Sequence, residues 1–185
     1  SFCGWFLNFY IEIFRGTPMI VQSMVIFYGS AQAFNISLDR TWAAIFIVSI
    51  NTGAYMSEIV RGGILAVDTG QFEAATALGM THGQTMRKVV LPQVVRNILP
   101  ATGNEFVINI KDTSVLNVIS VVELYFTGNT VATQNYQYFP TFTIIAVIYF
   151  ILTFTITRIL RYIERRLDSD TYTTGANQMQ VKEVK

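Results

Sequence analysis

Two carboxylates in an apolar segment are the residues most able to do chemistry in this chain. Glu105 and Asp112 are seven residues apart, and in an α-helix that spacing places both on one face, about 10 Å apart along the axis. Ionisable groups inside an apolar helix are costly and indicate function. We expect this pair to hold a cationic group of a substrate. The alternative is that Lys111 pairs with an acid on a neighbouring helix and only stabilises the fold.

Weaker candidates for the same contacts lie beside this pair and on an earlier segment. Asn104 adjoins Glu105, and Asn51 and Glu58 are again seven residues apart. A polar stripe on each of two helices is expected to converge on one pathway. Glu58 has an alternative partner in Arg61, a pairing that would be structural.

Several kinds of chemistry have no support in the sequence. No GxxxxGK[ST] loop occurs, so this chain is not expected to bind or hydrolyse ATP. The single histidine, His82, has no ligand-type residue at metal-binding spacing, and Cys3 is the single cysteine. We therefore predict no metal, no cofactor bound by this chain and no enzyme activity. The net charge of +1 gives no reason to expect nucleic acid.

The composition predicts that these residues lie on membrane-spanning helices. Charged residues make up 14% of the chain, against roughly a quarter in soluble domains, and none occurs between Leu124 and Thr157. A span needs about 20 mostly apolar residues. We predict an all-α, polytopic membrane protein. Residues 6–14 are a candidate backward extension of the first span, and buried core helices are the alternative for the shorter runs. The four candidate spans are approximately 18–33, 42–57, 98–122 and 142–157.

The distribution of lysine and arginine predicts the topology. Cations collect at alternate ends of the four candidates, and the loops at about 29–41 and 123–141 contain only Arg40. Because cytoplasmic loops are rich in these residues, we expect the loop after the second span and the C-terminus to be cytoplasmic. Residues 1–167 are predicted to form the membrane domain and the polar residues 168–185 a disordered tail. The chain begins inside an aromatic-rich segment, so we expect further residues before it.

The loop between the second and third candidates contains the stretch "FEAATALGMTHGQTMRKVVLP". Phe72, Ala75 and Leu78 recur at helical spacing and predict a short amphipathic helix, with Gly79 and Gly83 breaking it. Pro92 is then expected to open the next helix near its first turn, where a missing N–H costs least. The alternative is an ordinary surface helix.

This stretch resembles the EAA loop of the binding-protein-dependent ABC importer permeases. That pattern is Glu-Ala-Ala, three residues, Gly, nine residues, Ile, one residue and Leu-Pro, and here Val89 replaces the isoleucine. Segments 14–22, 54–64, 70–79 and 111–124 are similar to the polar amino acid branch, whose members carry substrates of the His, Gln, Arg and Glu type. The matching loop positions are Glu73, Ala74, Ala75, Gly79, Leu91 and Pro92.

The resemblance implies a permease of the type I ABC importer kind, with coupling helices at about 68–92 between two spanning helices. It implies transport of a polar amino acid across the bacterial cytoplasmic (inner) membrane. ATP and Mg²⁺ would be bound by cytoplasmic ABC ATPase subunits that contact the loop. Two further partners are implied, a second permease subunit and an extracytoplasmic solute-binding protein. Such permeases usually have another spanning helix before "FRGTP", and we expect it to be missing from this chain.

Three other functions are compatible with parts of the sequence. An ion-gradient-driven secondary transporter would have similar polar residues in its spans, but no reason for an EAA-like loop. A membrane adaptor that regulates an ATPase would not need the stripe of Glu105 and Asp112. An ABC permease for another small solute is the third alternative. The identity of the amino acid and the choice between homodimer and heterodimer stay open.

Overall fold

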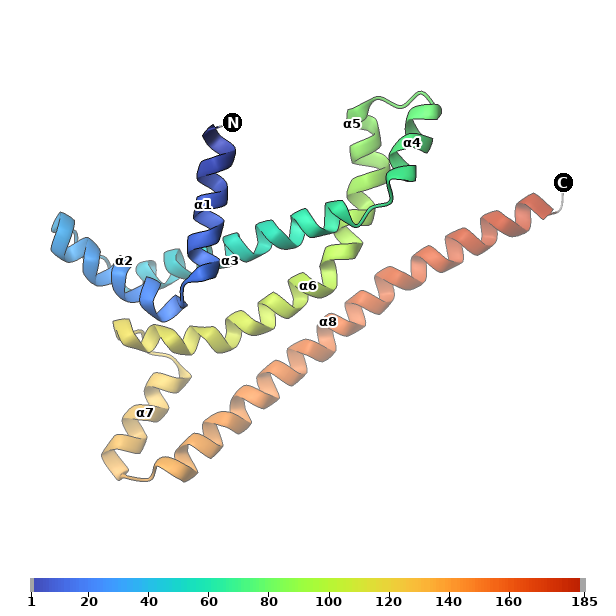
Figure 1. Cartoon of the computed structure of the whole chain (residues 1–185). Helices are drawn as coiled ribbons and strands as arrows, with labels where there is room; N and C mark the ends of the chain where they lie inside the picture. The colour runs from blue at the N-terminus through green and yellow to red at the C-terminus, as the bar shows by residue number, and fades with distance from the viewer. Residues whose placement is uncertain (1, 184–185) are drawn as a thin grey trace. The chain divides into compact units, whose positions relative to one another are not determined.

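The chain is helical throughout its described part. The computed structural model describes the backbone of residues 2–183 and the side chains of residues 4–167, and in these residues every regular element is a helix (Figure 1). This confirms the all-α prediction. Apolar segments form helices in a membrane because the backbone must satisfy its own hydrogen bonds there. The chain forms two compact units, Ser1–Glu58 with Glu105–Phe154 and Ile59–Asn104 with Thr155–Lys185, and each is described by itself.

The first unit begins with two helices rather than one. Helix α1 covers Phe2–Gly16 and α2 covers Met19–Phe34. Between them Pro18 has an extended ψ of 139°, and a proline also disfavours helical geometry in the residue before it. The suggested lengthening of the first span through 6–14 is therefore wrong. Helix α2 alone has 16 residues, fewer than the roughly 20 that a span needs.

The core of the first unit lies where α2, the beginning of α3 and the segment after α6 meet. Helix α3 covers Arg40–Leu65, and the 3₁₀-helix η2 covers Thr113–Ile119. Alanines on α3 let these backbones approach closely, as small residues do in membrane helices. The buried core residues, each at most 7% exposed, are Ala43, Ala44, Ile47, Leu116 and Ile119.

The third candidate span is bent. Helix α6 covers Leu91–Asp112 and tightens into η2, after which Ser120 adopts a left-handed φ of 60°. Helix α7 then covers Leu124–Asn135, inside a region expected to be a loop. The carboxylate of Glu123 caps α7 by accepting the amides of Tyr125 and Phe126 at 2.8 and 2.6 Å. Such a cap satisfies amides that have no partner within the helix.

Helix α8, Tyr138–Glu183, contains the fourth candidate span. It packs on α7 where the side chain of Ile145 fills the space that a side chain at Gly128 would occupy. The Tyr149 hydroxyl also donates to Glu123 at 2.9 Å. Side chains beyond Leu167 lie outside the described residues, so the disordered tail at 168–185 stays a prediction.

Two described helices are long and apolar enough to cross a membrane, namely α3 and the part of α8 that covers Tyr138–Leu167. A third crossing is formed if His82–Ile119 and Leu124–Asn135, which meet at a bend of 55°, count as one broken span. The fold is thus a polytopic helical one with two to three spans in the described residues.

The second unit contains a small helical element with its own apolar core. Helix α4 covers Thr69–Ala77, α5 covers His82–Thr85 and the π-helix η1 covers Met86–Val90. Val67, Val90 and Val94 are buried at its centre, 0–6% exposed. Partly buried side chains that pack against these valines are Phe72, Met86 and Ile98.

Two adjacent glycines in this unit allow a controlled test of the contact between α3 and α6. A Cβ on Gly63 would overlap the Ile98 methyl and lie 3.6 Å from the Val94 carbonyl oxygen, whereas a Cβ on Gly62 meets nothing within 4 Å. We expect Gly63→Ala to lower stability by about 1–3 kcal/mol through overpacking. Gly62→Ala should be neutral or stabilising because alanine favours the helix by about 1 kcal/mol. Thermal unfolding of the detergent-purified protein measures both, and equal melting temperatures would contradict this packing.

Candidate functional site

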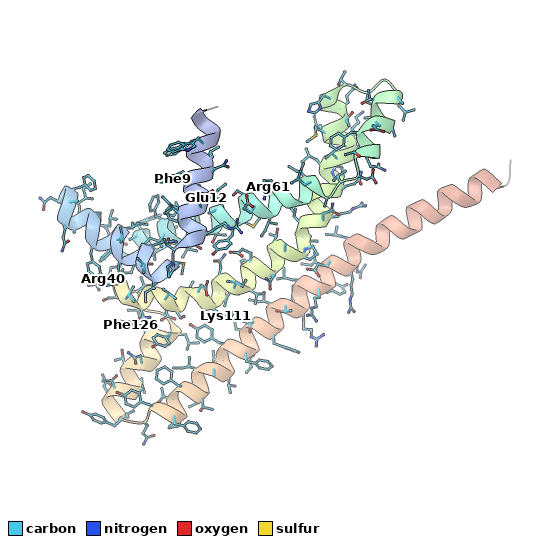
Figure 2. All side chains as sticks on the ribbon, in the orientation of Figure 1. Phe9, Glu12, Arg40, Arg61, Lys111 and Phe126 are labelled. Carbon is cyan, nitrogen blue, oxygen red and sulfur yellow. The ribbon has the colours of Figure 1, made fainter. Side chains whose placement is uncertain are left out.

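The acidic face of α6 is the first part of the candidate site. At 100° per residue, Glu105, Asn109 and Asp112 fall within about 60° of one another on α6. Glu105 is 9% exposed and Asp112 is half-buried. Lys111 is exposed and lies near the C-terminal end of α6 (Figure 2). The expected juxtaposition of the two acids on one helical face is therefore present.

This face of α6 meets α3 through a polar contact. The Thr52 hydroxyl donates to Asn109 Oδ1 at 3.2 Å. Asn109 lies between the two acids on the same face, so the contact places α3 next to the acidic face. The residue of α3 that reaches it is Thr52, whereas the sequence suggested Asn51 and Glu58.

Asn51 instead contacts the break between α1 and α2. Its amide donates to Gln22 Oε1 at 2.9 Å and to the Phe14 carbonyl at 3.4 Å. The Gln22 amide in turn donates to the Phe14 and Thr17 carbonyls and to the Thr17 hydroxyl, each at 2.9 Å. Gln22 and Asn51 are 6% and 8% exposed. Carbonyls at the end of a helix have no partner within the helix, so donating to them gives both side chains a structural task.

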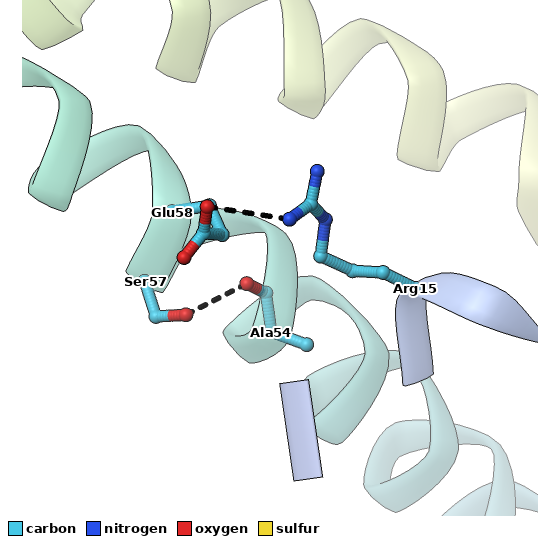
Figure 3. Close-up of polar contacts among 4 residues, drawn as sticks. All are labelled: Arg15, Ala54, Ser57 and Glu58. Carbon is cyan, nitrogen blue, oxygen red and sulfur yellow. Dashed lines mark hydrogen bonds and ion pairs between the residues drawn. The ribbon is translucent and has the colours of Figure 1, made fainter. Parts of the chain in front are cut away.

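Glu58 also faces this break. Its carboxylate lies 3.3 Å from a guanidinium nitrogen of Arg15 (Figure 3). The guanidinium carbon of Arg15 lies 5.8 Å from the centroid of the Tyr55 ring. Beside Glu58 the Ser57 hydroxyl donates to the Ala54 carbonyl at 2.7 Å. Arg15 was not among the partners that sequence spacing suggested for Glu58. Its side chain is 44% exposed, and an ion pair of this exposure stabilises by about 1 kcal/mol or less.

Asn104 lies away from the acidic face. It precedes Glu105 by one residue, so α6 turns it about 100° to one side. Lys111 is seven residues further along α6 and shares that side, and both residues are exposed. The candidate substrate contacts therefore divide among the acidic face of α6, its other side and the α1–α2 break.

The second part of the candidate site is the loop that resembles the EAA motif. Asp68 is the N-cap of α4, and its carboxylate accepts the Gly70 amide at 2.6 Å. Gly79, which follows the C-cap residue Leu78, has a φ of +76°. The Gly79 amide bonds the Thr76 carbonyl at 2.9 Å and the Met80 amide bonds the Ala75 carbonyl at 3.1 Å. This is a Schellman motif, in which glycine avoids the strain of a left-handed backbone.

The next helix begins two residues later with a capping box. The Thr81 amide donates to Gln84 Oε1 at 2.9 Å, and the Gln84 amide donates to the Thr81 hydroxyl at 3.4 Å. The spacing Thr-x-x-Gln is a start signal for a helix that can be identified in the sequence. Gly83 lies inside α5, so the expectation that Gly83 breaks the helix is wrong.

Pro92 is the second residue of α6, which follows the π-helix η1 without an intervening loop. Its place in the first turn of α6 matches the expectation, but it does not open a separate helix. The Leu91 amide bonds the Met86 carbonyl, five residues back. A wider turn of this kind accommodates a proline ring that would otherwise collide with the preceding turn.

The six motif positions are not all on one surface. Glu73, Ala74, Gly79 and Pro92 are exposed, and Leu91 is 46% exposed. Ala75 is only 3% exposed and thus packs inside the element. The neighbouring Leu78 is 82% exposed at the turn, which makes it an apolar side chain available to a partner.

Comparison with known proteins relates this arrangement to transport proteins. Residues 1–169 match the family model described as "Binding-protein-dependent transport system inner membrane component". The chain is 37% identical to the arginine transport system permease protein ArtQ of Bacillus subtilis over 166 residues, 90% of this chain and 76% of that protein. It is 41% identical to the glutamine transport system permease protein GlnP of Escherichia coli over 172 residues, which cover 90% of this chain and 78% of that protein.

Solved structures agree with this relationship. A crystal structure of an amino acid ABC transporter with histidines is 43% identical and matches with a TM-score of 0.81, over 86% of this chain and 74% of that one. An inward-facing structure of the MetNI methionine ABC transporter matches with a TM-score of 0.72 at 22% identity, over 85% of this chain and 72% of that one. The latter likeness concerns the fold alone.

The contact between Gln22 and Asn51 can be tested by a double-mutant cycle. Asn51→Leu leaves the Gln22 oxygen and the Phe14 carbonyl without this donor, and we expect it to lower the free energy of unfolding by about 1–3 kcal/mol. Gln22→Leu should lower it by a similar amount. The double variant should lower it by less than the sum of the two single effects, because fewer polar groups are left without a hydrogen-bond partner. Thermal unfolding measures the cycle, and substrate affinity is measured in parallel. A structural role would be contradicted if the two single effects on the free energy of unfolding added up in the double variant. It would also be contradicted if Asn51→Leu kept normal stability but lost substrate affinity.

Proposed function

The chain belongs to the family of binding-protein-dependent transport system inner membrane components, and we propose that it moves a polar amino acid across the inner membrane. Its relatives are permease subunits named for arginine and glutamine transport. Membership of this family makes the chain a multi-pass membrane subunit of an ABC importer that works with an ATPase. Permease subunits are not themselves enzymes, and the ATP and Mg²⁺ belong to the partner chain.

The observation that supports an amino acid substrate is the buried acid on α6. Glu105 is 9% exposed, and among the described residues no basic side chain forms an ion pair with its carboxylate. Asp112 and Asn109 share its face of α6. We propose that Glu105 and Asp112 contact the ammonium of the amino acid, since a buried carboxylate needs a charged or hydrogen-bonded partner.

The other expected substrate contacts are weaker proposals. Asn51 and Glu58 have protein partners at the α1–α2 break, which favours a structural role for both. Asn104 lies on a different side of α6 from Glu105. We therefore rank Asn104, Asn51 and Glu58 below the two acids, as residues that could line the pathway without binding substrate directly.

We propose that the loop at about 68–92 couples this chain to its ATPase. The element is compact because its valines form a core of their own, so a force on its surface can be transmitted to α6 as a unit. Glu73, Ala74 and Gly79 supply the exposed contact surface, together with Leu91 and Pro92. Ala75 supports that surface from inside, since it is 3% exposed.

Three further features complete the proposal. A second permease subunit, identical or homologous, lines the other half of the pathway, and a solute-binding protein delivers the amino acid from outside. The coupling loop and the C-terminus face the cytoplasm, because that orientation puts the cation-rich ends inside. An ion-gradient-driven mechanism is not favoured, since the relatives are subunits of ABC systems; another small solute is the alternative that substrate measurements address.

The substrate role of the acids predicts a loss of affinity without unfolding. In the complex with its ATPase, Glu105→Gln and Asp112→Asn should each weaken amino acid binding roughly tenfold or more, because a hydrogen bond to a charged group is removed. The measurement is substrate-dependent thermal stabilisation over a panel that includes arginine and glutamine. Glu12→Gln is the matched control, because it removes the same charge from an exposed position on α1. Unchanged affinity in both α6 variants would remove these acids from the site.

The coupling role predicts that equal charges at two glycines of one loop have unequal effects. Gly79→Asp adds a carboxylate at the exposed turn and strains a left-handed backbone by about 1–2 kcal/mol. Gly83→Asp adds the same charge at the start of α5, where a helix favours it. We expect Gly79→Asp to lower uptake severalfold at unchanged basal ATP hydrolysis, and Gly83→Asp to have little effect.

Both quantities are measured with the complex in vesicles, together with its binding protein. Wild-type uptake in Gly79→Asp with the ATPase still bound would argue against the coupling role. Equal losses in both variants would show that charge on the loop, rather than the turn at Gly79, controls uptake.

A further inference from the structure

Helix α8 has a dense group of cations directly after its apolar part. Residues 158–166 contain four arginines and one acid, Glu164. They lie at the C-terminal end of Tyr138–Leu167, a part of α8 that contains an 18-residue window with a mean hydropathy of 2.1. The basic side chains, all exposed, are Arg158, Arg161, Arg165 and Arg166.

Three of these arginines share one face of α8. At 100° per residue, Arg158, Arg161 and Arg165 fall within about 60° of one another. Leu160 and Glu164 occupy a different side of α8. That side faces α6, since a Cβ on Gly103 would lie 3.4 Å from Leu160 and 3.5 Å from the Glu164 carboxylate. The three arginines therefore lie on another face of α8 than the one packed on α6, and their side chains are exposed.

Tyr162 and Arg166 border the arginine face. Arg166 donates to the Tyr162 hydroxyl from Nε at 3.0 Å and from an Nη at 2.7 Å, and its guanidinium lies 5.3 Å from the ring centroid. Tyr162 is 57% exposed. Amphipathic rings of this kind favour the depth of the lipid headgroups, which places the neighbouring arginines at the same depth.

The continuation of the arginine face toward the N-terminal end of α8 is an apolar stripe. Four apolar residues precede Arg158 at the same alternation of three and four residues that separates the arginines. They are 47–61% exposed, and they are Ile144, Val147, Ile151 and Phe154. One face of a single helix therefore changes from exposed apolar side chains to exposed arginines. This is the order in which a phospholipid presents its acyl chains and its phosphate.

We propose that this face binds an anionic phospholipid, with the phosphate of the headgroup at Arg158, Arg161 and Arg165 and the acyl chains along the apolar stripe. Guanidinium groups bind phosphate oxygens in a bidentate manner. A basic cluster at the end of a span attracts anionic lipid, with roughly a fivefold gain in binding per cation. The adjoining apolar stripe favours a lipid over free phosphate or a soluble acidic protein.

The test uses the intact permease complex, with its ATPase, purified in detergent. Native mass spectrometry measures the binding of dioleoylphosphatidylglycerol and of dioleoylphosphatidylcholine, which differ only in headgroup. We expect wild type to bind the anionic lipid at least tenfold more tightly, with a preference that weakens as salt is raised. Arg161→Gln with Arg165→Gln should lower that affinity roughly 30-fold, whereas Arg161→Lys with Arg165→Lys should retain most of it.

The matched control is Arg87→Gln with Lys88→Gln, which removes two cations from η1 and should retain the preference. Unchanged binding in the Arg161 and Arg165 glutamine variant would overturn the proposal, as would an equal loss in the control. Equal competition by inorganic phosphate alone would show a phosphate site without lipid specificity. Dissociation of the complex in that variant, with no headgroup preference in wild type, would identify the face as a protein contact instead.

Discussion

A chain in hydrocarbon must supply partners for its own backbone, and the first unit is organised around a place where its helix cannot do so. Pro18 separates α1 from α2 and leaves carbonyls at the end of α1 without helical donors. The Gln22 amide satisfies those of Phe14 and Thr17, and Asn51 joins the same group from α3. The break therefore ties three helices together. Polar residues in apolar helices are in this case part of the fold, which is why their presence alone does not define a binding site.

The same reasoning separates the acids of α6 from those other polar residues. Asn51 has its amide occupied by Gln22, and Glu58 lies beside Arg15. Glu105 is buried and has no backbone break to repair, since α6 continues for seven residues beyond it. A buried carboxylate without such a task is costly. This contrast, more than the seven-residue spacing that the two pairs share, is what distinguishes Glu105 as a candidate for substrate binding.

Local sequence patterns predicted most of the long helices of this fold. Contacts between helices that are far apart in the sequence could not be predicted in this way. Long apolar runs predicted α3 and α8, because length and hydropathy determine a span. Helix α7 was not predicted, since it is less apolar and its cap is Glu123 rather than one of the preferred capping residues. The break at Pro18 and the capping box at Thr81 also have local sequence signals, a proline and the spacing Thr-x-x-Gln. The pairing of Arg15 with Glu58 joins separate helices, and no local pattern indicates it.

The loop between α3 and α6 shows that one sequence motif can combine two physical requirements. Gly79 is required by the left-handed turn that ends α4, and Ala75 packs inside the element. Glu73 and Ala74 are exposed and available to a partner. Because part of such a motif specifies the shape of the loop, we expect a substitution at Ala75 to act through folding of the element and one at Ala74 to act on the surface. A contact role for each motif position therefore depends on its exposure as well as on its match to the pattern.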